Sequence, residues 1–225
     1  MENIINMLRK TLENYEDFRY EYINGNQEPL ISLRDSLKEG FKNLLKQNKI
    51  LRINVYTNNG KYNNPPKLEN FNIAFLENKH SISKGIYSGI DFNDNEESLR
   101  VYISTSYTNK PNRQEWENIF LSLYEELNKY FHWEIPLKDK EHNWRFFSKK
   151  FTLVSINDED FANILDPIQV GIFYTRLIIN KNLKLVEKYL NVEGLLKFET
   201  EDIKERINIL IKKEINKDKN NLKIL

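Results

Sequence analysis

The chain has 225 residues, of which 30% are charged and 40% hydrophobic, and its formal net charge is +1. This length and composition fit a folded protein with its own core, and the near-neutral charge restricts any DNA contact to a local patch. The absence of cysteine excludes disulfides, a thiolate nucleophile and cysteine metal sites. Since no apolar run reaches the roughly 20 residues of a membrane span and no signal-peptide pattern begins the chain, we expect a cytoplasmic protein that does not contact a membrane.

Residues 1–48 are predicted to form two helices. Apolar residues recur at helical spacing in two stretches, which the turn-forming sequence "NGNQEP" separates. Pro29 suits the first turn of the second helix, because proline lacks the N–H group that would be unpaired there. The apolar sides of these helices can cover one face of a sheet.

Four strands are predicted between residues 51 and 105, in "LRINVYT", "FNIAFL", "GIYSGIDF" and "LRVYIST". Each alternates apolar residues with polar, aromatic or small ones, so that one face of the sheet is apolar and the other is mixed. We call the second one the mixed face. Its residues are Arg52, Asn54, Tyr56, Asn72, Ala74, Tyr87, Gly89, Asp91, Arg100, Tyr102 and Ser104.

Further elements follow the four strands. A helix is predicted from about Arg113 to Tyr130, followed by a strand in "NWRFFSKKFTLVSI". Another helix is predicted from Asp158, capped by Asn157, and the last helix starts near Thr200. The predicted fold class is α+β, with a curled, mostly antiparallel sheet flanked by helices and a C-terminal helical segment.

Motifs for catalysis are not found in the sequence. The three histidines match no metal-ligand spacing, and neither a nucleophile elbow nor a phosphate-binding loop occurs. Asp91, Asp94 and Glu96, followed by Arg100, fit a short, degenerate metal-nuclease pattern, although an acidic turn between two strands explains them more simply. We therefore expect a binding domain without a catalytic site or a cofactor, with a metal-dependent nuclease as the alternative.

The third predicted strand can form part of a pocket. One side of it carries Tyr87, Gly89 and Asp91. Tyr87 would form an aromatic wall and Gly89 would leave space, while the Asp91 carboxylate could accept a hydrogen bond from an exocyclic amino group. Asn72, on the preceding strand, can donate and accept at a base edge. The alternative interpretation is structural: Tyr87 covers the sheet, Gly89 forms a bulge and Asp91 begins a turn.

Five stretches, in this order, resemble the N-terminal DNA-binding domain of the McrB subunits of McrBC modification-dependent restriction systems. They are "LRINVYTNNGKYNNPPKLENFNIAFL", "SKGIYSGIDF", "LRVYISTSYTNKPNRQEW", "WRFFSKKF" and "DFANILDPI". The likeness covers roughly residues 50 to 170. It implies that residues 1–170 are a modified-DNA-binding domain and that residues 171–225 are a helical extension or a linker towards a motor domain outside this chain.

The resemblance implies binding of double-stranded DNA that carries a modified base, with the base flipped into a pocket. The pocket would include Asn72, Tyr87, Gly89 and Asp91, with Tyr56 or Trp144 as a further wall. On the long polar loop, Tyr62 would be inserted into the duplex to offset the cost of flipping. The residues that would hold the DNA phosphates are Gly60, Lys61, Lys67 and Lys84.

The resemblance also implies a partner and a default base. A nuclease subunit would be engaged through the motor domain, and 5-methylcytosine is the default base of the family. Asn72 replaces an aromatic residue of the family, and Asp91 replaces an apolar one, so this pocket is more polar. N6-methyladenine is therefore an alternative base. A protein-binding or RNA-binding adaptor built on the same sheet is a further alternative function.

Overall fold

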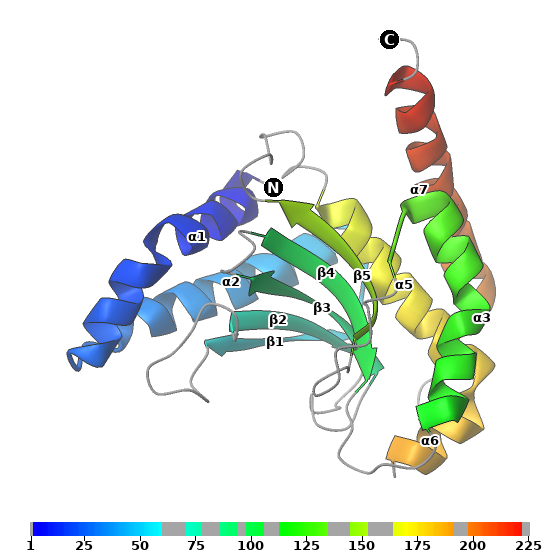
Figure 1. Cartoon of the computed structure of the whole chain (residues 1–225), viewed down its shortest axis with the longest axis horizontal. Coiled ribbons are helices and arrows are strands. Elements are labelled where there is room, and N and C mark those ends of the chain that lie inside the picture. The colour runs from blue at the N-terminus through cyan, green and yellow to red at the C-terminus, as the bar shows by residue number, and fades with distance from the viewer. Residues whose placement is uncertain are drawn as a thin grey trace. The chain divides into compact units, whose positions relative to one another are not determined.

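The computed structural model describes most of the chain as helices and strands (Figure 1). The residues described are 2–59, 71–77, 86–93, 98–105, 113–134, 145–152, 164–190 and 198–221. The helices are α1 (Glu2–Ile23), α2 (Glu28–Gln47), α3 (Arg113–Phe131), α5 (Leu165–Lys181), α6 (Leu183–Leu190) and α7 (Thr200–Asn221). The strands are β1 (Ile53–Asn59), β2 (Phe71–Glu77), β3 (Ile86–Asn93), β4 (Ser98–Thr105) and β5 (Arg145–Thr152).

The strands form an open antiparallel sheet in the order β1-β2-β3-β4-β5, which is also their order along the chain. The register of β1 and β2 places Val55 opposite Phe75 and Tyr56 opposite Ala74. Residues directly opposite one another in an antiparallel pair lie on the same face. The predicted α+β class, the antiparallel sheet and the C-terminal helix are confirmed.

Most elements begin and end near their predicted positions. The two N-terminal helices, the first four strands, the helix from Arg113 and the last helix from Thr200 are all present. The fifth strand is present as β5, and the other residues of its predicted stretch, 143–144 and 153–156, lie outside the described residues. The helix predicted from Asp158 begins outside the described residues, and the described helix that follows is α5, from Leu165.

Two compact units divide the described chain. Unit 1 comprises residues 1–79, 89–101 and 150–165, and unit 2 comprises residues 80–88, 102–149 and 166–225. Each unit therefore takes segments from distant parts of the sequence. The predicted division of the chain at residue 170, within α5, stays a prediction.

The core of unit 1 forms where α2 packs on the apolar face of β1 and β2. The apolar side of α2 is buried there, with the residues Leu30, Leu37, Phe41, Leu44 and Leu45. The ring of Phe41 meets that of Phe75 edge to face, with 5.4 Å between centroids. Figure 1 shows α1 running beside α2. The amphipathic pattern of the first 48 residues is thus satisfied by burial against the sheet and between the two helices.

Helix α2 ends in a Schellman motif that contains no glycine. The N–H of Lys49 donates to the carbonyl of Lys46, and the N–H of Ile50 donates to that of Leu45. Lys49 adopts the left-handed conformation this motif needs, with φ 57°. Burial of Ile50 supplies the apolar contact that accompanies such an ending, and so helps to hold a non-glycine residue in this conformation.

The core of unit 2 is built around α5, which is buried along nearly its whole length. The ring of Tyr174 meets that of Phe131 edge to face at 6.1 Å, and its hydroxyl donates to Glu126 at 2.6 Å. Figure 1 shows α3 and α7 side by side, and their residues are in contact. Although α5 is buried on all sides, neither it nor any other described helix has the length and hydropathy that crossing a bilayer requires.

Gly171 lets α5 approach β3 closely. A Cβ atom at this position would lie 2.9 Å from Cβ of Ser88 and 3.4 Å from the ring of Trp133. Ser88 and Trp133 are fully buried, and the first of these distances is shorter than van der Waals contact allows. The absence of a side chain is therefore required for helix and strand to pack at this distance.

We expect Gly171→Ala to lower the free energy of unfolding by about 1–3 kcal/mol, because the added methyl group overpacks this contact. Denaturant unfolding of the purified protein measures the change. The cost should shrink in a Ser88→Gly background, where the clashing Cβ is gone. An equal cost in both backgrounds would contradict this explanation.

Candidate functional site

In unit 1 the mixed face lies on the side of the sheet opposite α2. Because Phe75 contacts α2 and alternate residues point to opposite faces, Ala74 and its partner Tyr56 point away from that helix. Tyr56 is 38% exposed, whereas Ala74 is fully buried. This face therefore carries an accessible aromatic side chain beside the small, buried side chain of Ala74.

Asn72 lies at one end of this face. It is half-buried, and its side-chain oxygen is buried without a hydrogen-bond partner in the described part of the chain. Since β2, β3 and β4 are consecutive and antiparallel, the start of β2, the end of β3 and the start of β4 lie at the same end of the sheet. Asn72, Asp91 and Arg100 occupy these three positions.

Asp91 is paired with Arg100 across β3 and β4. Nε of Arg100 donates to Oδ1 of Asp91 at 3.1 Å, and Nη2 donates to Oδ2 at 3.4 Å. The Asp91 side chain is 1% exposed, and that of Arg100 is 24% exposed. A fork of this kind is stronger than a neutral hydrogen bond and fixes the orientation of both groups. The carboxylate that we expected to face a base is therefore engaged with an arginine.

Arg100 was not among the predicted pocket residues. In the sequence, Asp91 and Arg100 each alternate with the apolar residues of their strand, so both were assigned to the mixed face. The signal available in the sequence was an opposite charge on the same face of the next strand, at the matching end of a hairpin. The alternation alone did not distinguish this pair from two unrelated surface charges.

The remaining described pocket candidates fall in different units. Gly89 is buried in unit 1, on the same face as Asp91. Tyr87 belongs to unit 2, where its ring meets that of Tyr102 edge to face at 6.2 Å. The structural role considered for Tyr87, covering the sheet, agrees with this aromatic contact.

Other predicted site residues lie outside the described residues. They are Gly60, Lys61, Tyr62, Lys67, Lys84 and Trp144. Their assignments to DNA insertion, phosphate binding and the pocket wall stay predictions.

Metal-ligating residues do not cluster in the described part of the chain: no three histidine, aspartate or glutamate side chains there are grouped to hold an ion. Asp94 and Glu96 of the alternative nuclease pattern lie outside that part. The described member of the pattern, Asp91, instead accepts hydrogen bonds from Arg100. The nuclease alternative thus gains no support from the described side chains.

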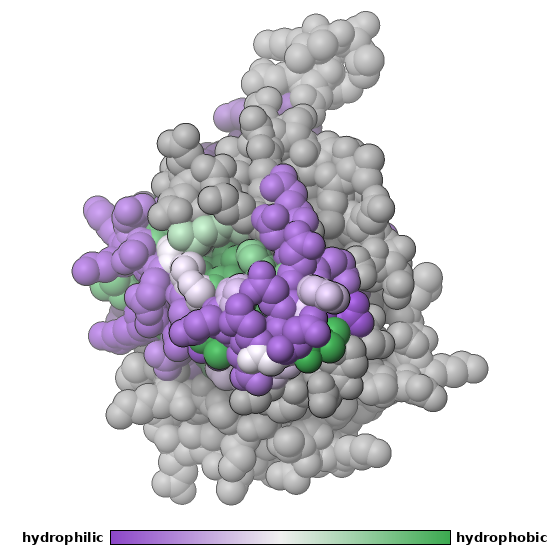
Figure 2. Space-filling model, turned by 90° about the vertical axis from the view of Figure 1, so that its left-hand side faces the viewer, coloured by the Kyte–Doolittle hydropathy of each residue, from purple (hydrophilic) through white to green (hydrophobic). Residues whose placement is uncertain are grey.

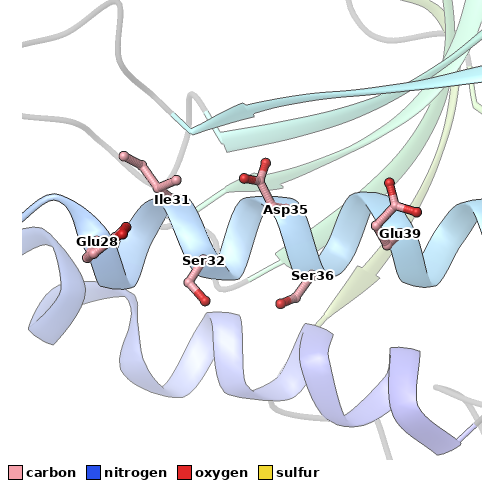
Figure 3. Close-up of a pocket in the computed structure, with 6 residues that line it drawn as sticks. All are labelled: Glu28, Ile31, Ser32, Asp35, Ser36 and Glu39. Carbon is pink, nitrogen blue, oxygen red and sulfur yellow. The ribbon is translucent and has the colours of Figure 1, made fainter.

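An open groove of about 510 Å³ runs along α2 (Figure 3). Its lining residues are Glu28, Ile31, Ser32, Asp35, Ser36 and Glu39. Figure 2 shows one side of the molecule, where the described residues are mostly hydrophilic around a smaller hydrophobic area. Asp35 is paired with Arg34 and Glu39 with Lys42, so this groove is a solvated, carboxylate-rich surface. Its carboxylates would repel a DNA phosphate.

A second ion-pair cluster joins α5 and α7 within unit 2. The buried carboxylate of Asp166 accepts from Lys213 at 3.0 Å and from Lys217 at 3.3 Å. Burial alone would lower the pKa of Lys217, yet the carboxylates of Glu214 and Asp166 together raise it. This cluster holds α7 in place, since removal of the lysines would leave a buried, unpaired carboxylate.

Lys149 of β5 lies beside this cluster and points to the end of α3. Its ammonium group donates to the carbonyl of Phe131 at 3.0 Å, where the helix leaves its last carbonyls unpaired. Burial lowers the pKa of Lys149 below its ordinary 10.5, although the Glu214 carboxylate acts in the opposite direction. The charged form of this lysine therefore costs stability in the folded protein.

We expect Arg100→Met to lower the free energy of unfolding by about 3 kcal/mol or more, because the buried Asp91 carboxylate loses its partner. The double variant Asp91→Leu/Arg100→Met should recover much of this loss, because it removes both charges. Denaturant unfolding of the two variants measures the difference. If the single and double variants are equally stable, the ion pair has no such role.

We also expect wild-type protein to gain stability relative to Lys149→Met as the pH rises from 7 towards 10. Because the folded-state pKa of Lys149 is lowered, the unfolded chain retains its proton at a pH where the folded protein has lost it, and stability then rises with pH. Unfolding curves of both proteins across this range give the difference. A difference that stays constant with pH would contradict the lowered pKa.

The chain gives no significant match to a protein-family model, a curated protein sequence or a solved structure.

Proposed function

We propose that this chain is the DNA-reading module of a modification-dependent restriction system, and that it binds a modified base flipped out of the duplex. The observation that supports this proposal best is the composition of the mixed face in unit 1. It carries an exposed aromatic ring at Tyr56, an amide at Asn72 whose buried oxygen has no hydrogen-bond partner among the described residues, and the Asp91–Arg100 ion pair. Catalysis would belong to other chains or domains.

These groups suit a planar, polar ligand. A flipped base offers a flat surface for stacking and an edge with donors and acceptors, and enzymes and readers that flip bases bind them through both. Tyr56 offers an aromatic surface of the kind that stacks on a base. Asn72 can supply both an acceptor and a donor. A buried amide oxygen without a partner costs stability, and a bound base would remove this cost by donating to it.

The proposal extends to the base and the partners. The base is 5-methylcytosine by family default, with N6-methyladenine as the alternative that the more polar pocket admits. Its cytoplasmic partner would be a nuclease subunit, engaged through a motor domain outside this chain. The near-neutral net charge favours a small footprint on DNA rather than broad phosphate contact. The acidic groove on α2 would lie away from the duplex, because its carboxylates repel phosphate.

We expect the chain to bind a short duplex with one modified base at least about tenfold more tightly than the unmodified duplex. Fluorescence anisotropy would compare unmodified DNA with duplexes that carry 5-methylcytosine, 5-hydroxymethylcytosine or N6-methyladenine, each at low and at physiological salt. Asn72→Ala should reduce the preference, because it removes the amide proposed to bind the base edge.

Ser32→Ala, in the acidic groove on the other side of unit 1, is a matched control that should leave binding unchanged. Equal affinity for all four duplexes would refute base-specific reading. Absence of any DNA binding would refute the DNA-reading function and favour the adaptor alternative.

A further inference from the structure

We infer that Arg100, rather than Asp91, contacts the ligand of the mixed face, and that Asp91 is a positioning residue that aims the Arg100 guanidinium. This inference rests on the proposed function, because it assigns a role within the same site. It replaces the expectation that the Asp91 carboxylate itself accepts a hydrogen bond from the base. The site would then present hydrogen-bond donors where a carboxylate would have presented acceptors.

The two side chains of the pair differ in how far they are exposed to solvent. Asp91 is buried almost completely, whereas Arg100 retains 24% of its side-chain exposure. The carboxylate therefore lies on the inner side of the pair and the guanidinium on the outer side. Both carboxylate oxygens accept from Arg100. A ligand that approaches this end of the sheet meets the guanidinium first.

The guanidinium keeps donors for a ligand. Nε and Nη2 donate to Asp91, and the hydrogen bonds of the Arg100 side chain within the described residues go to Asp91 alone. The remaining N–H groups of the fork point away from the carboxylate, because the guanidinium is planar and rigid. An arginine fixed in this way loses little further entropy when it binds a second group.

The chemistry of the fork defines the ligand. A guanidinium has no acceptor, so the ligand must offer acceptors such as a carbonyl oxygen and a ring nitrogen at adjacent positions on a base edge. Asn72 lies at the same end of the sheet and would complete the edge by accepting from an exocyclic amino group. A DNA phosphate offers acceptors too, and the experiment below separates phosphate from base.

Arg100→Lys tests the inference, because lysine keeps the positive charge beside Asp91 but loses the planar fork. The variant would be titrated with two duplexes, one with the modified base that the wild type prefers and one with an abasic site at the same position. We expect affinity for the modified duplex to fall about tenfold or more, and affinity for the abasic duplex to stay unchanged. A thermal melt confirms that the variant is folded.

Arg34→Lys is the matched control, since Arg34 also pairs with an aspartate in unit 1, at 2.8 Å, but lies on α2. It should leave both affinities unchanged. If Arg100→Lys does not fold, the double variant Asp91→Asn/Arg100→Gln removes both charges together and should show the same selective loss.

The outcomes separate the inference from the function on which it rests. An equal loss on both duplexes, with a weaker dependence on salt, would assign Arg100 to a phosphate and overturn the inference. Unchanged affinity for both would leave the pair a purely structural link between strands and also overturn it. Either result is compatible with a wild type that prefers modified DNA. A wild type without that preference refutes the proposed function itself, and the inference with it.

Discussion

The requirement that each strand bury one apolar face determines where polar chemistry can occur in this protein. In unit 1, the contact between Phe41 and Phe75 commits one side of the sheet to α2. All residues of opposite parity then face away from that helix, whether or not they have a function there. The mixed face is thus a consequence of core formation, and a charge buried there needs a partner within that face. The Asp91–Arg100 pair shows how one buried charge met this requirement.

The sequence predicted the elements whose signal is periodic. Helix α2 and strands β1 to β4 each have a single apolar side, and their predicted spans agree with the structure to within a few residues. Helix α5 was harder to place because it is buried on all sides, so its apolar residues show no helical stripe. The end of α2 could not be predicted from the sequence either, because Lys49 takes the left-handed conformation that sequence rules assign to glycine.

The candidate site was predictable in its location but not in its connections. Alternation predicted that Tyr56, Asn72 and Asp91 share one face. The register of β1 and β2 puts Tyr56 and Asn72 on the same face, and the ion pair joins Asp91 to Arg100 on the next strand. Alternation carries no information about which charge lies opposite which, because that depends on the register of β3 and β4. The partner of Asp91 therefore became evident only from the ion pair with Arg100. Contacts formed between distant segments, such as Asp166 with Lys213 and Lys217, are beyond any local pattern for the same reason.

The close approach at Gly171 has a consequence for how α5 can move. Ser88 leaves no room for a side chain on the part of α5 that faces it, and Gly171 lies there. A rotation of α5 about its axis would bring a larger residue into that place. A slide along the axis by one turn would do the same, since Ile168 and Tyr174, three residues away on that face, are both bulky. Gly171 therefore restricts both the rotation of α5 about its axis and its position along that axis, as long as the helix stays packed on β3. A displacement of α5 that keeps it packed on β3 must therefore keep Gly171 next to Ser88.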